Sequence, residues 1–118
     1  MKKYLVIGNP IDHSLSPKLQ NYWIKLNKIE AIYGKLQAHD QDLKELCNNI
    51  KNGQLDGLNV TVPFKKKIIP FLDVLSGHAL RTQSVNTVCL NNGNLTGRLI
   101  GSFLLPSYDD CHVVTFGL

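Results

Sequence analysis

The stretch NVTVPFKKK, residues 59–67, joins a strand pattern to an abrupt stop. Because side chains alternate across a strand, Asn59 and Thr61 share one face and the two valines share the other. Pro63 lacks the backbone donor that a central strand needs, so the strand ends there, and a helix can begin with proline in its first turn. The pattern therefore predicts a strand with one polar face, followed at its end by Lys65.

Outward from this stretch, strand and helix patterns alternate along the chain. Residues 3–8, 31–37 and 55–63 are predicted to be strands, with helices at residues 15–27 and 39–53. The segment SVNTVCLNNGNLTG then predicts a hairpin around an Asn-Asn-Gly turn. The order strand, helix, strand, helix, strand implies parallel crossovers. We therefore expect an α/β fold with a mainly parallel sheet, flanking helices and a C-terminal hairpin.

Each predicted helix has its own boundary signals and its own apolar stripe. The first is expected to begin at a Ser16 cap followed by Pro17. Its predicted buried stripe has helical spacing and consists of Leu19, Tyr22, Trp23 and Leu26. The second is expected to begin near Asp40 and to stop at Gly53. Its predicted stripe consists of Leu43, Leu46, Cys47 and Ile50.

Composition limits the class of protein. The chain has 118 residues, of which 43% are hydrophobic, and this is typical of one globular domain. The N-terminus lacks the apolar run of a signal peptide, and no stretch approaches the roughly 20 apolar residues of a membrane helix, so a cytoplasmic protein without a membrane segment is predicted. Four histidines and three cysteines form no CxxC or HExxH spacing, and no metal site is expected.

Polar side chains follow three of the predicted strands. Ligands of such sheets bind beyond the carboxyl ends of the strands, where the sequence places His13, Ser14, Ser16, Asn59, Thr61, Lys65, Ser84, Asn86 and Thr87. Neutral hydrogen-bonding groups with one cation suit a small, hydroxyl-rich anion. A lysine beside a hydroxyl carbon can also transfer a proton. Plainer interpretations stay open, because a serine before proline caps helices and a lysine run is often a solvated helix face.

Three blocks of the sequence together resemble a known family. GNPIDHSLSPKLQN, DGLNVTVPFKK and SVNTV resemble the signature blocks of the shikimate dehydrogenase family, over residues 4 to about 97. The resemblance implies an N-terminal α/β domain that binds shikimate or 3-dehydroshikimate through Ser14, Ser16, Asn59, Thr61, Lys65 and Asn86. It further implies that the serines hold the carboxylate and that Lys65 is the catalytic proton-transfer residue. The family reduces 3-dehydroshikimate to shikimate with NADPH, in the pathway to chorismate and aromatic amino acids.

The chain also departs from the family pattern. Position 101, where the family has an aspartate that pairs with the lysine, is Gly101, and no GxGxxG turn of a dinucleotide-binding fold occurs. We expect a shikimate-binding domain at residues 1–97, a tail without an assigned structure at residues 98–118, and no NADP-binding Rossmann domain. The chain is thus interpreted as truncated or altered after Gly97, and as inactive alone.

Two other classes of function, a non-catalytic binding module and a nucleic-acid-binding domain, are alternatives to this interpretation. A non-catalytic module that binds shikimate or quinate needs only the residues already named. A nucleic-acid-binding domain would suit the net charge of +4, but no helix-turn-helix, RRM or zinc pattern supports it. The choice between shikimate and quinate, the choice between NADP and NAD, and the oligomeric state stay open at this point.

Overall fold

The computed structural model describes residues 1–100, which form a six-stranded sheet with helices on its faces. In chain order the elements are β1 (Lys2–Gly8), α1 (Ser16–Leu26), β2 (Ala31–Gln37), η1 (Asp40–Asp42), α2 (Leu43–Lys51), β3 (Gly57–Val60), α3 (Phe64–Lys67), η2 (Ile69–Phe71), β4 (Val74–Leu75), α4 (His78–Thr82), β5 (Thr87–Asn91) and β6 (Asn94–Arg98). The strand order is β2-β1-β3-β5-β6-β4. No helix within these residues is long and apolar enough to cross a membrane.

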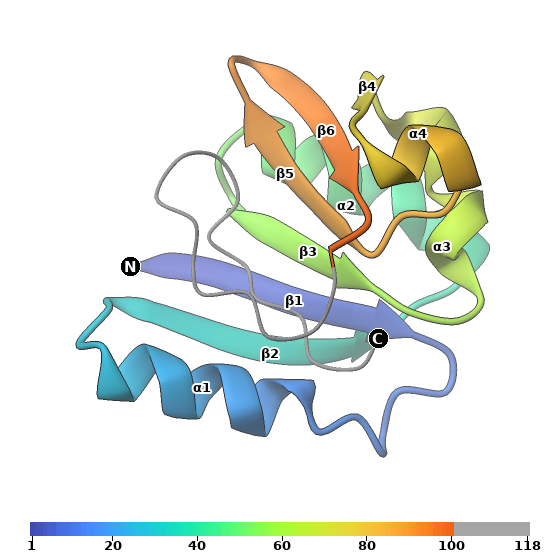
Figure 1. The fold of residues 1–118 in the computed structure, drawn as a ribbon. Helices are drawn as coiled ribbons and strands as arrows, with labels where there is room; N and C mark the ends of the chain where they lie inside the picture. Colours follow the sequence, from blue (N-terminus) through green and yellow to red (C-terminus); the bar gives the residue numbers. More distant parts are fainter. Residues whose placement is uncertain (101–118) are drawn as a thin grey trace.

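The sheet combines a parallel half with a hairpin. Strand β1 pairs in parallel with β2 and β3, whereas β5 runs antiparallel to both β3 and β6 (Figure 1). The hairpin turns at Asn92 and Gly93, whose φ values of 52° and 81° are those a two-residue turn requires. The predicted α/β class with a C-terminal hairpin is confirmed, and the short strand β4 beside β6 was not predicted.

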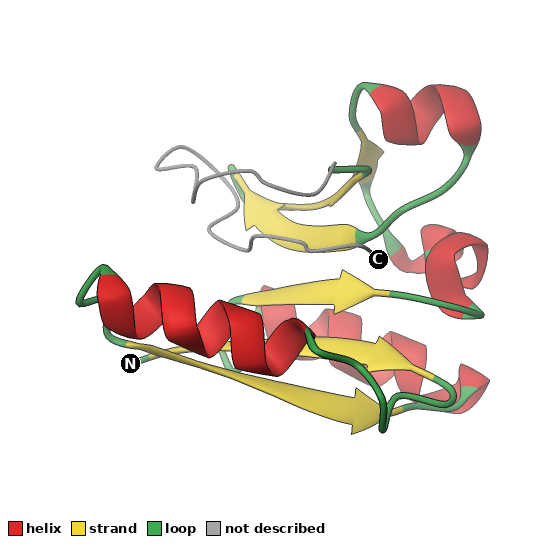
Figure 2. Ribbon diagram, turned by 60° about the horizontal axis from the view of Figure 1, so that its bottom comes forward, coloured by secondary structure: helices red, strands yellow, loops and turns green. Residues whose placement is uncertain are grey.

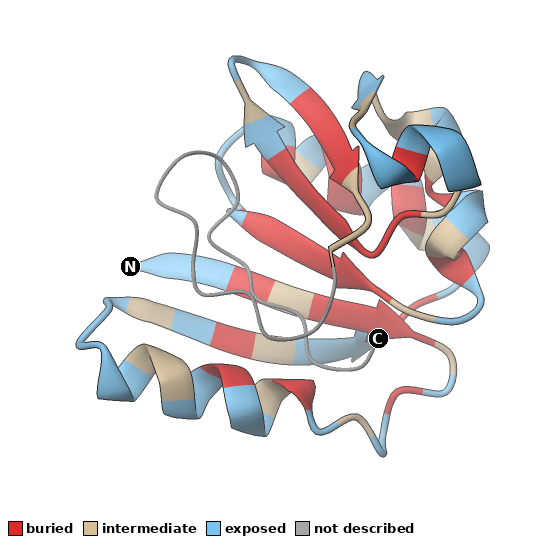
Figure 3. Cartoon of the chain, in the orientation of Figure 1, coloured by how far each residue is buried: buried red, intermediate tan, exposed pale blue. Residues whose placement is uncertain are grey.

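The two faces of the sheet carry cores of different size. Helix α1 lies on one face beside β1 and β2, and α2 lies on the opposite face (Figures 1 and 2). The α2 side holds the larger cluster, which includes Ile7, Leu58 and Val88. The α1 side holds a small cluster of Tyr4, Val6, Ile11 and Tyr33. Buried positions accordingly concentrate on the central strands, while most of α1 is exposed (Figure 3).

Helix α2 follows the sequence prediction closely. All four residues of its predicted stripe are buried, and Gly53 has a φ of 83°, a left-handed conformation that ends the helix. The start of the helical segment differs from the predicted cap at Asp40, because His39 is the N-cap of the preceding turn η1. The His39 backbone N–H donates to Asp42 Oδ2 at 2.8 Å.

Helix α1 contradicts the prediction for its buried face. Of the predicted stripe, Leu19, Tyr22 and Leu26 are exposed, at 41%, 65% and 60%, and Trp23 is half-buried. The buried residues of the helix are Ser16 and Gln20. The apolar spacing is helical, but spacing alone does not say which face meets the sheet. Ser16 is the first helical residue and not the cap, because Leu15 occupies the cap position and makes no side-chain capping bond.

Candidate functional site

The carboxyl ends of β1, β2 and β3 meet at one edge of the sheet, where the loop after β1 and helix α3 also lie (Figure 1). Gly8 ends β1 at this edge. A Cβ built on Gly8 would lie 2.6 Å from Thr61 Cγ2, so only glycine admits the chain of residues 61–62 this closely. Hydrogen bonds from Thr61 N to Ile7 O and from Asn9 N to Val62 O fix that approach. Thr61 is therefore held against the end of β1.

Asn59 forms the centre of a buried polar network. Its Nδ2 donates to Asn86 O and to Thr87 Oγ1, both at 3.1 Å. Its Oδ1 accepts a hydrogen bond of 2.6 Å from the Tyr33 hydroxyl. Tyr33 lies on β2, two strands away, so its ring reaches across β1 on the α1 side of the sheet. The network thus joins β2, β3 and β5 through side chains.

Asn86 extends this network to the end of β6. Its Nδ2 donates to Ile100 O at 2.8 Å, and its Oδ1 accepts from Ile100 N at 2.9 Å. The Thr87 hydroxyl also donates to Asn86 Oδ1, at 3.1 Å. Because a backbone N–H only donates and a carbonyl only accepts, these contacts fix the orientation of the amide. Asn86 therefore clamps the backbone that leads to position 101.

After these contacts, each of the two asparagines can make one further hydrogen bond, as a donor or as an acceptor. An amide group has two N–H donors and an oxygen with two lone pairs. Asn59 uses both donors and one lone pair, so it can only accept one further bond. Asn86 uses both lone pairs and one donor, so it can only donate one. In hydrogen-bonding capacity, Asn59 therefore suits a ligand hydroxyl and Asn86 suits a hydroxyl or a ketone. Both side chains are buried in this structure, at 0% and 3% exposed, so a ligand reaches them only if it displaces what covers them.

Lys65 differs from the two lysines that follow it. Its carbonyl accepts a hydrogen bond of 2.9 Å from Val85 N, which places its backbone beside the residue before Asn86. Within residues 1–100, its half-buried side chain has no hydrogen bond or ion pair, whereas Lys67 pairs with Asp40. Lys66 donates to Gln83 O at 3.5 Å. Of the three, Lys65 is the lysine whose ammonium group has no partner among the described residues.

The serine pair lies at the start of α1. Ser14 Oγ accepts a hydrogen bond of 3.2 Å from Ser16 N. Ser14 is half-buried and Ser16 is 3% exposed. No hydrogen bond among the described residues joins the serines to Asn59 or Asn86. The described hydrogen bonds therefore link Asn59 with Asn86 and Ser14 with Ser16, but do not link these two pairs with each other.

Tyr33 is a residue of this site that the sequence analysis did not single out. Burial raises the pKa of its hydroxyl, which therefore stays protonated and donates to Asn59. In the sequence it is one aromatic residue in a strand pattern, which is typical of core. Only the register, in which Tyr33 pairs with Tyr4 and Tyr4 with Gly57, brings it near Asn59.

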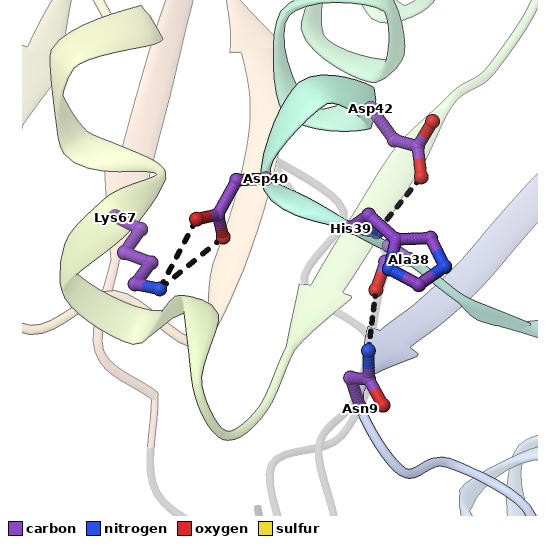
Figure 4. Close-up of polar contacts among 6 residues, drawn as sticks. All are labelled: Asn9, Ala38, His39, Asp40, Asp42 and Lys67. Atoms are coloured by element: carbon purple, nitrogen blue, oxygen red, sulfur yellow. Dashed lines mark hydrogen bonds and ion pairs between the residues drawn. The ribbon is translucent and has the colours of Figure 1, made fainter.

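A polar cleft lies at the same edge of the sheet, on the α2 side. It has a volume of about 390 Å³ and is lined by Asn9, His39, Asp40, Gln41, Pro63, Phe64 and Lys67. Figure 4 shows the bonds that frame it. Lys67 Nζ lies 3.2 Å from Asp40 Oδ1, and Asn9 Nδ2 donates to Ala38 O at 3.1 Å. None of the six predicted binding residues lines this cleft, so we treat it as a structural link between α3, η1 and β1.

Residues 1–100 contain neither the side-chain cluster of a metal site nor the glycine-rich turn of a dinucleotide site. Within residues 1–100, no group of three His, Cys, Asp or Glu side chains could hold a metal ion. A dinucleotide needs a glycine-rich turn between the first strand and its helix. Residues 9–15, which connect β1 and α1, contain no glycine. This part of the chain therefore does not fit NADP.

Comparison with known protein families gives one clear match. Residues 6–88 match the model of the family described as the shikimate dehydrogenase substrate binding domain. A shikimate dehydrogenase (NADP(+)) of Pelagibacter ubique is 54% identical over 96 residues, which are 81% of this chain and 36% of that protein. The corresponding protein of Pyrococcus furiosus is 44% identical over 100 residues, which are 85% and 35% of the two chains. The chain spans about a third of the length of these curated relatives.

Solved structures agree with the sequence comparison. A shikimate 5-dehydrogenase from Listeria monocytogenes, in complex with shikimate and NAD, matches with a TM-score of 0.78 and 33% identity. The match covers 84% of this chain and 34% of that one. The shikimate dehydrogenase of Aquifex aeolicus matches with a TM-score of 0.76 and 40% identity, over 83% of this chain and 37% of that one.

Proposed function

Because this chain belongs to the shikimate dehydrogenase family, through its substrate-binding domain, we propose that it binds shikimate and 3-dehydroshikimate. The observation that carries the proposal is the polar network centred on Asn59, which leaves one acceptor on Asn59 and one donor on Asn86. A ligand with several ring hydroxyls, one of which becomes a ketone, matches this pair of groups. The protein as a whole is proposed to catalyse the NADP-dependent interconversion of these two ligands, as an oxidoreductase of the cytoplasm.

The site residues are proposed to divide the ligand between them. Ser14 and Ser16 hold the carboxylate, because hydroxyl donors at a helix start stabilise an anion. Asn59 Oδ1 accepts a hydrogen bond from a hydroxyl that stays a hydroxyl throughout the reaction. Thr61 and Asn86 bind the remaining ring oxygens. All six residues lie within the proposed domain of residues 1–97, although β6 continues to Arg98.

Lys65 is proposed to be the catalytic residue. Its ammonium group can donate to the oxygen of the reacting carbon, and it can deliver or receive the proton that this oxygen gains or loses. Gly101 occupies the position at which the family has its partner aspartate, and it lies outside the described residues. The two aspartates of the tail, Asp109 and Asp110, also lie outside them. NADP supplies redox chemistry in the relatives, and we assign no residue of this chain to it, because residues 1–100 do not fit it.

Calorimetry with shikimate tests the proposed binding roles. Replacing Ser14 and Ser16 together by alanine is expected to weaken binding by roughly 2 to 4 kcal/mol, because hydrogen bonds to a charged group are strong. Lys65→Ala removes one contact to a neutral hydroxyl and is expected to cost about 1 kcal/mol. If Lys65→Ala abolishes binding while the double serine variant binds normally, the proposed orientation of the ligand is reversed.

Assays of turnover separate binding from catalysis. Since the described residues provide no dinucleotide site, we expect the chain alone to bind shikimate without converting it, as a binding module would. Purified chain is mixed with shikimate and NADP, and NADPH absorbance is followed beside a Lys65→Ala control. Shikimate-dependent NADPH formation clearly above that control contradicts this expectation.

A further inference from the structure

Gln20 is a buried polar residue whose side chain has no partner among residues 1–100. It is 4% exposed, and its Nε2 atom is buried without a hydrogen bond. Among residues 1–100 its side-chain oxygen also makes none, so exchanging the two ends of the amide would not satisfy the group. Buried polar side chains in native structures are normally paired, and an unpaired one lowers stability. A leucine or methionine at this position would avoid that cost.

The neighbouring amide on the same helix behaves differently. Asn21 Nδ2 donates to Tyr33 O at 2.8 Å, and Asn21 Oδ1 accepts from Tyr33 N at 3.1 Å. Asn21 therefore docks α1 on the backbone of β2, and these two bonds account for a polar residue at this position. Gln20 makes no comparable contribution to docking, and its polar group needs another explanation.

The position of Gln20 on the helix directs it toward the serine pair. Ser16 and Gln20 are the two buried residues of α1. Residues four apart lie on the same helical face, and helical side chains lean toward the N-terminus. Helical geometry therefore directs the Gln20 side chain toward the turn that begins with Ser16, where the Ser14 and Ser16 hydroxyls and the first N–H groups of the helix are found.

All the groups gathered at this turn can donate hydrogen bonds, and none is acidic. The first turn of α1 contains no Asp or Glu, and Ser16 is not used as a cap. A set of neutral donors at the positive end of an eleven-residue helix suits a carboxylate. We propose that Gln20 is a third carboxylate-binding residue, whose Nε2 donates to the ligand carboxylate held by Ser14 and Ser16. This assignment rests on the proposed shikimate-binding function.

The test combines stability with binding, because the two should change in opposite directions. Gln20→Met keeps the length of the side chain and removes the unpaired amide. Its Tm in thermal unfolding is expected to equal or exceed that of the wild type, while Asn21→Leu, which removes a paired amide, lowers Tm. In calorimetry, the Kd of Gln20→Met for shikimate is expected to rise about tenfold, the effect of losing one hydrogen bond to a charged group.

The methyl ester of shikimate identifies the group that Gln20 contacts. It lacks the negative charge, so wild type and Gln20→Met are expected to bind it with Kd values within about threefold of each other. Equal loss of affinity for acid and ester would place Gln20 elsewhere on the ligand and overturn the assignment. Unchanged shikimate binding, or a Tm as low as that of Asn21→Leu, would overturn it too. If the wild type does not bind shikimate at all, the proposed function fails first, and the assignment fails with it.

Discussion

Replacing Tyr33 by phenylalanine removes one buried oxygen atom and leaves the ring in place. The change deletes the 2.6 Å hydrogen bond to Asn59 Oδ1, and no other described group donates to that oxygen. In the ligand-free protein Asn59 is 0% exposed, so water cannot readily replace the lost donor. A buried acceptor left without its partner costs about 1 to 3 kcal/mol. We therefore expect Tyr33→Phe to lower the free energy of unfolding by about 2 kcal/mol.

Urea denaturation followed by circular dichroism measures this change. The slope with urea should stay constant while the midpoint falls, because the amount of surface exposed on unfolding does not change. Tyr22→Phe is a matched control, since it makes the same chemical change at a side chain that is 65% exposed. That variant should unfold within about 0.5 kcal/mol of the wild type.

A small effect at Tyr33 would refute the structural reasoning. If Tyr33→Phe and Tyr22→Phe have equal unfolding free energies, the hydroxyl does not hold Asn59. The remaining capacity of Asn59 would then no longer be limited to one acceptor. In that case the match between Asn59 and a permanent ligand hydroxyl loses its basis.

Two further predictions concern the edge of the sheet and the pH dependence of stability. Gly8→Ala should lower the free energy of unfolding, measured by urea denaturation, by about 1 to 3 kcal/mol, because its Cβ would lie 2.6 Å from Thr61 Cγ2. Gly34→Ala is the control. Its Cβ would meet only a side-chain atom at 3.3 Å, so it should change stability much less. Burial raises the pKa of the Cys47 thiol from 9.0 to about 11, so the unfolded chain loses this proton first and the free energy of unfolding should fall between pH 9 and 11. Cys47→Val should show a shallower decline over this range, and an identical decline would contradict the assignment.

The sequence was informative where a pattern and its physical cause are local. The proline at position 63 and the Asn-Gly turn each act over a few residues, and α3 and the hairpin form beside them as predicted. The third strand is shorter than its predicted range of residues 55–63, because β3 ends at Val60 and Thr61 and Val62 lie beyond it. The apolar stripe of α2 was also correct, since one side of that helix is apolar and the other is charged.

Other features depend on how distant segments are placed. The spacing of Leu19 and Tyr22 predicts a helix but does not give the direction of its apolar face, which here points away from the sheet. The link from Tyr33 to Asn59 depends on the register of three strands. Gln20 stands out because its buried amide has no hydrogen-bond partner among the described residues, and hydrogen-bond partners cannot be read from a sequence alone.

The unequal cores imply that the two faces of the sheet unfold locally with different ease. Helix α1 rests on four buried side chains and on the two bonds of Asn21, whereas α2 belongs to the large cluster. Segments with few buried contacts open at lower free energy than the global transition. Backbone amides of α1 should therefore exchange with deuterium sooner than those of α2. A ligand anchored on the first turn of α1 would slow that exchange, so binding would stabilise most strongly the part of the domain that is least stable without it.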